Sequence, residues 1–212
     1  MKTQIETNPI EIAHKSFRII EDLVDLSAFS KQVKPVIKRI IHTTGDIEFA
    51  QMCYLNEDAV LSGMNAIRNS CNIITDVQMV ATGINRKNLQ AFNCDIHTAI
   101  SLPEVEKIAL EKNITRAIAA ADYLKPLMNK AIVMCGNAPT FLYRVMEMID
   151  SGEINPALIV AFPVGFVGAA ESKEQLLTYS DRVPIISNKG NKGGSAICSA
   201  VLNALVLNLT HK

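Results

Sequence analysis

The spacing of hydrophobic positions changes about one third of the way along the chain. Before residue 70 apolar residues recur at three- and four-residue intervals, which predicts amphipathic helices. Asn8 as N-cap and Pro9 at the first helical position predict where the first helix begins, with Glu11 completing a capping box. Further helices are expected over 32–43 and 58–69. Four apolar residues would share one face of the first helix: Ile12, Ile19, Leu23 and Leu26.

After residue 70 short apolar runs alternate with helical stretches. Five runs are expected to be strands: 71–75, 93–97, 131–135, 157–161 and 183–186. The helices expected with them cover 105–112, 117–128, 140–151, 171–180 and 195–208. Continuous apolar strands alternating with helices indicate a mainly parallel sheet covered on both faces. The predicted fold is therefore α/β, with a three-layer, flavodoxin-like sheet of five to six strands. We expect one domain over 1–212, with a mainly helical segment (1–70) before the α/β core (71–212).

Composition narrows the class of protein. Hydrophobic residues make up 49% of the chain, which is enough for a large buried core. Lys+Arg and Asp+Glu both number 21, so no basic excess favours nucleic-acid binding. The five cysteines contain no CxxC pair and are expected to be reduced core thiols. The chain shows no signal-peptide core and no apolar run of ~20 residues, so we expect a cytoplasmic protein without membrane contact.

Three glycine-bearing loops, 135–140, 163–173 and 189–195, each follow a predicted strand and open a predicted helix. Such loops expose backbone N–H groups to anionic ligands. None has the GxGxxG spacing of a dinucleotide fold or the GK[ST] ending of a P-loop. Glycines also let backbone approach a flat ligand closely. Tight turns between packed elements explain any one loop, but explain three at successive strand ends less well.

His42 opens a small polar segment, 42–46, at the end of an apolar helical run. Imidazole has an unperturbed pKa of about 6.5 and suits proton transfer near neutrality. The alternative is a helix-terminal histidine that interacts with local carbonyls. His14, His97 and His211 show no HxxxH or HxH spacing, so no metal site of the protein itself is expected.

Five motifs occur in a fixed order along the chain: HTTGD at 42–46, Thr115-Arg116, GNAPT at 136–140, PVGFVGAAESK at 163–173 and KGGS at 192–195. In order and spacing they resemble the precorrin-8X methylmutase family of cobalamin biosynthesis, from about residue 13 to residue 207. The resemblance implies an isomerase that moves a methyl group from C-11 to C-12 of precorrin-8X or cobalt-precorrin-8, giving hydrogenobyrinate or cobyrinate. It implies no cofactor, since any cobalt arrives inside the tetrapyrrole substrate.

The resemblance also assigns roles to residues. His42 matches the catalytic acid, while Ser16 and Arg39 match substrate contacts and Arg116 an arginine that faces the active site. Arg39 and His42 are three residues apart, so they should share a helix face. The remaining expected substrate contacts come from the glycine-bearing loops: Gly136, Asn137, Thr140, Gly165, Gly193 and Gly194.

Two functions from different classes stay open at this point. The first is the methylmutase, expected as a homodimer with its sites near the subunit contact. The second is a non-catalytic corrinoid-binding protein that hands the product to the next enzyme of the pathway. The role of His42 discriminates between them, because a carrier needs it only for packing or a hydrogen bond. The sequence leaves both the cobalt-containing and the metal-free substrate open.

Overall fold

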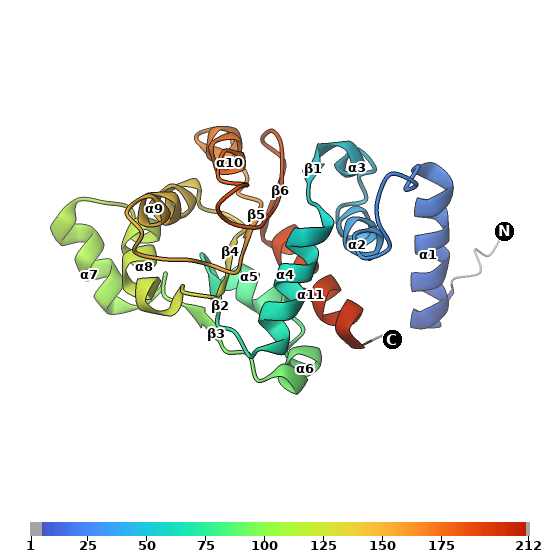
Figure 1. Cartoon of the computed structure of the whole chain (residues 1–212), viewed down its shortest axis with the longest axis horizontal. Helices are drawn as coiled ribbons and strands as arrows, with labels where there is room; N and C mark the ends of the chain where they lie inside the picture. Colours follow the sequence, from blue (N-terminus) through green and yellow to red (C-terminus); the bar gives the residue numbers. More distant parts are fainter. Residues whose placement is uncertain (1–5, 211–212) are drawn as a thin grey trace.

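The computed structural model of the chain describes residues 6–210. Its centre is a six-stranded sheet in the order β1-β6-β5-β4-β2-β3 (Figure 1). All neighbouring strands are parallel except β1, which runs antiparallel to β6. The strands are β1 (Cys53–Tyr54), β2 (Ile73–Thr75), β3 (Ile96–Thr98), β4 (Ile132–Cys135), β5 (Leu158–Ala161) and β6 (Ile185–Asn188).

The five strands predicted from apolar runs are present within a few residues of the expected bounds. They are arranged as in flavodoxin, because β3-β2-β4-β5-β6 is the order 2-1-3-4-5 of that fold. The strand order reverses between β2 and β4, and this is where doubly wound sheets bind ligands. The sequence did not predict β1, whose two residues pair with Ser187 and Asn188 and are too few to form a pattern.

Helices cover both faces of the sheet, as expected for three layers. The α-helices are α1 (Pro9–Leu23), α2 (Lys34–Thr44), α3 (Phe49–Met52), α4 (Glu57–Arg68), α5 (Gln78–Gly83), α6 (Arg86–Leu89), α7 (Pro103–Lys112), α8 (Arg116–Leu124), α9 (Pro139–Asp150), α10 (Ala169–Leu177) and α11 (Ser195–Thr210). Two short 3₁₀ helices, Gln90–Phe92 and Lys125–Leu127, complete them. The short helices α3, α5 and α6 were not predicted.

The two faces of the sheet support two separate hydrophobic clusters. Alternate strand residues belong to different clusters: Ile73 packs with α2, α4 and α11, whereas Ile74 packs with α7, α8 and α9. Helix α1 lies outside this arrangement, against α2 (Figure 1). No helix among residues 6–210 combines the length and the apolar character needed to cross a membrane.

Helix α1 begins as predicted but packs differently. The Asn8 side chain caps it by accepting the N–H groups of Ile10 and Glu11, and Pro9 is its first residue. The predicted capping box is wrong, because the Asn8 N–H donates to the Glu6 carboxylate at 2.9 Å. The predicted apolar face is also largely exposed. Of its four residues only Leu26 is buried, and the exposed fractions of the others are Ile12 46%, Ile19 47% and Leu23 62%.

Candidate active site

A buried carboxylate occupies the point where the strand order reverses. Asp76 directly follows β2 and is fully buried. Its two oxygens accept the backbone N–H groups of Gly136 at 3.0 Å, Asn137 at 2.8 Å and Ala138 at 2.8 Å. Burial raises the pKa of Asp76, and the three N–H donors oppose that rise. The loop that we expected to offer Gly136 and Asn137 N–H groups to a substrate carboxylate therefore offers them to Asp76.

Two of the predicted glycines serve close packing. A Cβ on Gly136 would lie 2.8 Å from the Ser195 Cα, and one on Gly193 would lie 2.4 Å from the Phe162 carbonyl oxygen. The Gly194 N–H donates to the same Phe162 carbonyl at 2.7 Å, and its φ of 131° favours glycine. These contacts hold the ends of β4 and β5 against the start of α11. Close packing and turn geometry therefore account for these glycines.

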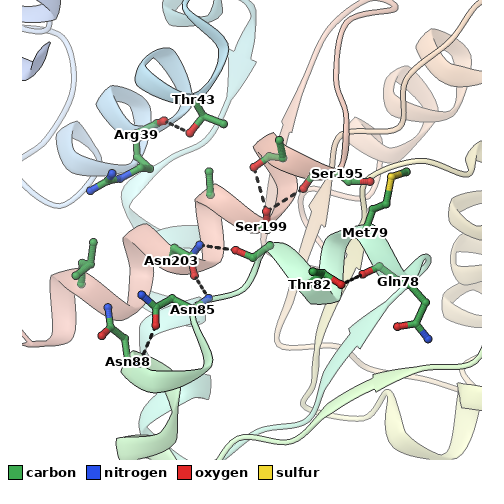
Figure 2. A pocket seen from close by; sticks show the side chains of 14 residues that line it. Arg39, Thr43, Gln78, Met79, Thr82, Asn85, Asn88, Ser195, Ser199 and Asn203 are labelled. Carbon is green, nitrogen blue, oxygen red and sulfur yellow. Dashed lines mark hydrogen bonds between the residues drawn. The ribbon is translucent and has the colours of Figure 1, made fainter. Parts of the chain in front are cut away.

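A cavity of about 790 Å³ lies beside this packing. Figure 2 shows α11 across its centre, with α2 on one side and α5 and α6 on the other. Within the described part of the chain Arg39 is its single charged lining residue, and Ser195 and Ala196 bring the N-terminus of α11 to it. A helix N-terminus favours a negative charge. This cavity therefore suits an anionic ligand.

Many polar side chains of this cavity are already engaged. The hydroxyls of Thr43, Thr82 and Ser199 donate to carbonyls of their own helices. Asn203 accepts the Asn85 N–H and donates to the Gly83 carbonyl (Figure 2). By contrast, the hydroxyl of Ser195 is buried and makes no hydrogen bond within residues 6–210. Ser195 and Arg39 are thus groups with donors to offer a ligand.

A second cavity of about 740 Å³ adjoins the first at Arg39 and Leu207. Among residues 6–210 its lining is basic and contains no carboxylate, although the whole chain has no net charge. The basic side chains that line it are His14, Lys31, Lys38, Arg39 and Arg68. Of these, Lys38 is paired with Glu21 at 2.6 Å. Local clustering thus supplies the positive charge that overall composition lacks.

His42 lies in the last turn of α2, which ends at Gly45 in the left-handed conformation (φ 65°), as predicted. Its Nδ1 is 2.8 Å from the Ser16 Oγ of α1. It lines a third cavity of about 410 Å³ between α1 and α2. Partial burial, and secondarily the charge of Arg39, lower the pKa of His42. The predicted pair His42 and Ser16 is therefore brought together.

Phe17 joins His42 to Arg39. Its ring centroid is 5.2 Å from that of His42 and 5.0 Å from the Arg39 guanidinium carbon. The predicted shared helix face is confirmed, because both side chains reach the same aromatic ring. Burial lowers the pKa of Arg39, which marks a partly desolvated guanidinium. Phe17 was not predicted, and its position beside Ser16 was the only signal in the sequence.

A buried lysine holds the loop before α11. Lys173 is fully buried, and its Nζ donates to Asn188 Oδ1 at 3.2 Å and to the Lys192 carbonyl at 2.7 Å. Burial lowers the pKa of Lys173 to about 8. The side chain of Lys192 pairs with Asp46 and Glu48, both at 2.7 Å, just beyond the His42 turn. The loop before α11 is thereby held by the buried Lys173 side chain and by the ion pairs of Lys192 with the segment after α2.

The other predicted contacts lie apart from these cavities. Arg116 is exposed at the first position of α8. Thr140, near the start of α9, accepts a hydrogen bond from the Thr115 hydroxyl at 3.1 Å. Gly165 has φ 138° in the loop after β5, and its N–H donates to the Asn191 carbonyl at 3.3 Å. None of the three predicted contacts lines the cavities described above.

Residues 6–210 contain no group of three or more His, Cys, Asp and Glu side chains placed to hold a metal ion. His97 instead pairs through Nε2 with the Asn72 side-chain oxygen at 3.1 Å. His211 lies outside the described residues.

Comparison with known proteins identifies the family. Residues 11–208 match the family model described as precorrin-8X methylmutase. The chain is 39% identical to a cobalt-precorrin-8 methylmutase of Leptospira interrogans, with 92% of each chain covered. It is 37% identical to a precorrin-8X methylmutase of Pseudomonas aeruginosa, with 92% of this chain and 93% of that protein covered.

A solved structure gives the same result. The precorrin-8x methyl mutase from Thermus thermophilus superposes with a TM-score of 0.85 at 37% identity, covering 94% of this chain and 98% of the other. These matches cover nearly the whole length of this chain and of each relative, so the similarity is not confined to the sheet. The chain belongs to the precorrin-8X methylmutase family.

Proposed function

We propose that the chain moves a methyl group from C-11 to C-12 of precorrin-8X or cobalt-precorrin-8, within one molecule and without a methyl donor. The observation that carries this proposal is that His42 and Arg39 contact the same ring, that of Phe17. Arg39 lines two cavities whose linings, among residues 6–210, contain no carboxylate, and His42 lines the third cavity. A proton donor and a cation thus adjoin space for a large polycarboxylated ring. The reaction is an isomerisation, so atoms and electrons balance without a redox partner.

His42 acts as the general acid in this proposal. It protonates the ring nitrogen next to the migration site, which withdraws electron density and favours a [1,5]-sigmatropic shift of the methyl group. The Ser16 hydroxyl at Nδ1 orients the imidazole and leaves Nε2 to meet the substrate. The lowered pKa makes the imidazolium a stronger acid. Substrate carboxylates that pair with Arg39 remove part of the charge that lowers this pKa.

Recognition of the substrate rests on local charge. Arg39 donates to a carboxylate in a two-pronged arrangement, and the N-terminus of α11 and the Ser195 hydroxyl donate to another carboxylate. The basic lining of the second cavity, including Lys31 and Arg68, receives further acidic side chains of the ring. Arg116 and Thr140 lie outside these cavities, so their contact with substrate requires a ligand that extends toward α8 and α9.

The carrier function is less well supported. The relatives described above are named methylmutases, and a carrier gives no reason for a histidine held by a serine beside an arginine. A homodimer and a cytoplasmic location are further parts of the proposal, as is transfer of the product to the next enzyme. The exposed apolar residues Ile12, Ile19 and Leu23 on α1, with Ile47 nearby in the same cavity lining, support a second copy of the chain as the partner.

One experiment separates catalysis from carriage and identifies the substrate. Purified chain is incubated with metal-free and with cobalt-containing precursor, and formation of the corrin chromophore is followed by visible spectroscopy. Turnover of many equivalents of one precursor supports the enzyme, whereas tight binding of product without turnover supports the carrier. For the dimer, light scattering should give about twice the 23.2 kDa chain mass. Ile19→Glu should shift that mass toward the single chain.

A further inference from the structure

Two of the five cysteines occupy neighbouring positions at the amino end of the sheet. The parallel register of β2 and β3 pairs Ile73 with Ile96. The same register, followed two residues upstream, places Cys71 opposite Cys94. The Ile73 N–H donates to the Asp95 carbonyl at 2.8 Å, so the two chains remain paired there. Neighbouring strands are about 4.8 Å apart, which lies within the Cα separations of about 4.4–6.8 Å found in disulfides.

The two side chains also point to the same side. Both pack in the cluster under the end of α4, where the Cys71 N–H donates to Ala66 and the Cys94 thiol donates to the Ile67 carbonyl. A thiol–thiol hydrogen bond raises the pKa of Cys71 and lowers that of Cys94. The strand register and the side of the sheet therefore agree in placing the two thiols together, and the pKa shifts are consistent with this placement.

We propose that Cys71 and Cys94 form a reversible redox pair that closes to a disulfide by exchange with a small disulfide of the glutathione class. The Cys94 thiolate attacks one sulfur of the oxidised glutathione and releases one glutathione thiolate. The Cys71 thiolate then attacks the Cys94 sulfur of the mixed disulfide and releases the second. Two thiol protons leave the protein, and its two electrons reduce one glutathione disulfide to two glutathione molecules.

The two sulfurs differ in the way this order requires. Cys94 is partly exposed, and the hydrogen bond from Cys71 lowers its pKa, which favours the attacking thiolate. Cys71 is 8% exposed, and the same hydrogen bond together with burial raises its pKa. When glutathione caps Cys94, that hydrogen bond to a thiolate is lost and Cys71 is freer to ionise. Cys94 is thus the entry point and Cys71 the resolving thiol.

The remaining cysteines are unsuited to this chemistry. Cys135 and Cys198 are 0% exposed, and burial raises the pKa of each well above its usual value. Burial also raises the pKa of Cys53 to about 12. Within residues 6–210 no further His, Cys, Asp or Glu joins Cys71 and Cys94 as a metal ligand. A disulfide therefore fits this pair better than a metal site.

The cross-link acts on the active-site wall. Residues 72–93 between the two cysteines carry α5 and α6, which supply Gln78, Thr82 and Asn88 to the cavity of about 790 Å³. Closing this segment restricts the unfolded chain and should raise the melting temperature by on the order of 10 °C. Oxidation of this pair thus makes the α5–α6 wall of the cavity more rigid.

The test exposes the folded full-length chain to oxidised glutathione at pH 8, followed by alkylation of free thiols and tryptic mass mapping. Trypsin cuts after Arg68, Arg86, Lys87 and Lys107, so the two cysteines fall in separate peptides, 69–86 and 88–107. The expected result is a linked pair of these peptides, a loss of two free thiols, a raised melting temperature and full reversal by dithiothreitol.

Variants assign the order of attack. Cys71→Ser should stop at glutathione attached to Cys94, Cys94→Ser should give neither product, and Cys53→Ser should behave as wild type. The mapping of wild-type chain needs no variant and holds even if one of them folds poorly. The proposal is overturned if the folded chain keeps all five thiols, if the link joins other cysteines, or if it appears only in urea.

Discussion

Two pairs of charged side chains near the carboxyl end of the sheet differ in their burial and in whether the chain itself supplies their hydrogen-bond partners. Asp76 and Lys173 are 0% exposed, and each is bound by atoms of the chain itself: Asp76 by three backbone N–H groups, Lys173 by Asn188 and a backbone carbonyl. Arg39 and His42 instead stand at cavities and contact the ring of Phe17.

This contrast separates framework charge from ligand-binding charge. A buried charge must be satisfied within the protein, since leaving it unpaired is expensive. Asp76 and Lys173 therefore have little bonding capacity left for substrate. Arg39 lines two cavities to which residues 6–210 contribute no carboxylate, so its donors remain directed at a ligand. The number of partners that a charge finds inside the chain is a better guide to function than its place in a motif.

Replacing His42 by alanine should give the largest effect on the cavity side. A positioned general acid contributes about 10²–10⁴-fold to rate, so turnover should fall by that factor while product binding is retained. The measurement is the rate of chromophore formation together with a product titration. Ser16→Ala is the matched control, because it removes the orienting hydroxyl but keeps the acid, and should lose less. Near wild-type turnover of His42→Ala would make this histidine structural.

Replacing Asp76 by alanine should give the largest effect on the framework side. Three backbone N–H groups, that of Gly136 buried, lose their acceptor, and we expect the free energy of unfolding to fall by about 3 kcal/mol. Urea unfolding measures it. Asp76→Asn keeps one carbonyl oxygen and should recover part of the loss.

Ser195→Ala should reduce substrate affinity more than stability, the reverse of the effect expected for Asp76→Ala. Its hydroxyl has no partner within residues 6–210, so stability should change by only about 0.5 kcal/mol while substrate affinity declines. Equal destabilisation by Asp76→Ala and Ser195→Ala would remove the distinction between framework and cavity.

Replacing Arg39 by lysine tests geometry at constant charge. Lysine keeps the cation but loses the two-pronged donor arrangement, so product affinity should weaken by about tenfold to a hundredfold. Titration with product corrinoid at two salt concentrations measures it, and salt should weaken wild-type binding only moderately. Lys31→Arg, in the basic cavity, is a charge-conserving control that should change affinity little. Unchanged affinity of Arg39→Lys would exclude Arg39 from the site.

Lys173 should leave a smaller signature in the pH dependence of stability. Its folded-state pKa of about 8 lies below the ordinary 10.5, so between these values the unfolded chain binds more protons. Ionisation of Lys173 therefore makes stability rise with pH through this window, by on the order of 1–2 kcal/mol. Ionisation of the buried thiols makes stability fall with pH instead. This contribution is the same in wild type and in Lys173→Met, so it cancels in their difference. The difference between the two unfolding curves should show the rise, and parallel curves would contradict it.

The layers of this protein were predictable from the sequence alone. The change from helical to short apolar spacing predicted five parallel strands and the long helices between them, because periodicity reflects which residues one element must bury. Local chemistry likewise placed the Asn8 cap, the Gly45 helix end and the shared face of Arg39 and His42. Each of these depends on residues a few positions apart.

Only the tertiary structure decided which polar groups remain for a ligand. The loop around Gly136 looked like an anion cradle until the fold brought Asp76 into it from 60 residues away. The face of Ile12, Ile19 and Leu23 looked like core but is exposed, because α1 packs on α2 through other residues. A polar group bonds to the partner that the folded chain brings within reach, and it is then no longer available to a ligand. Such partners come from distant strands and helices, which local pattern does not record.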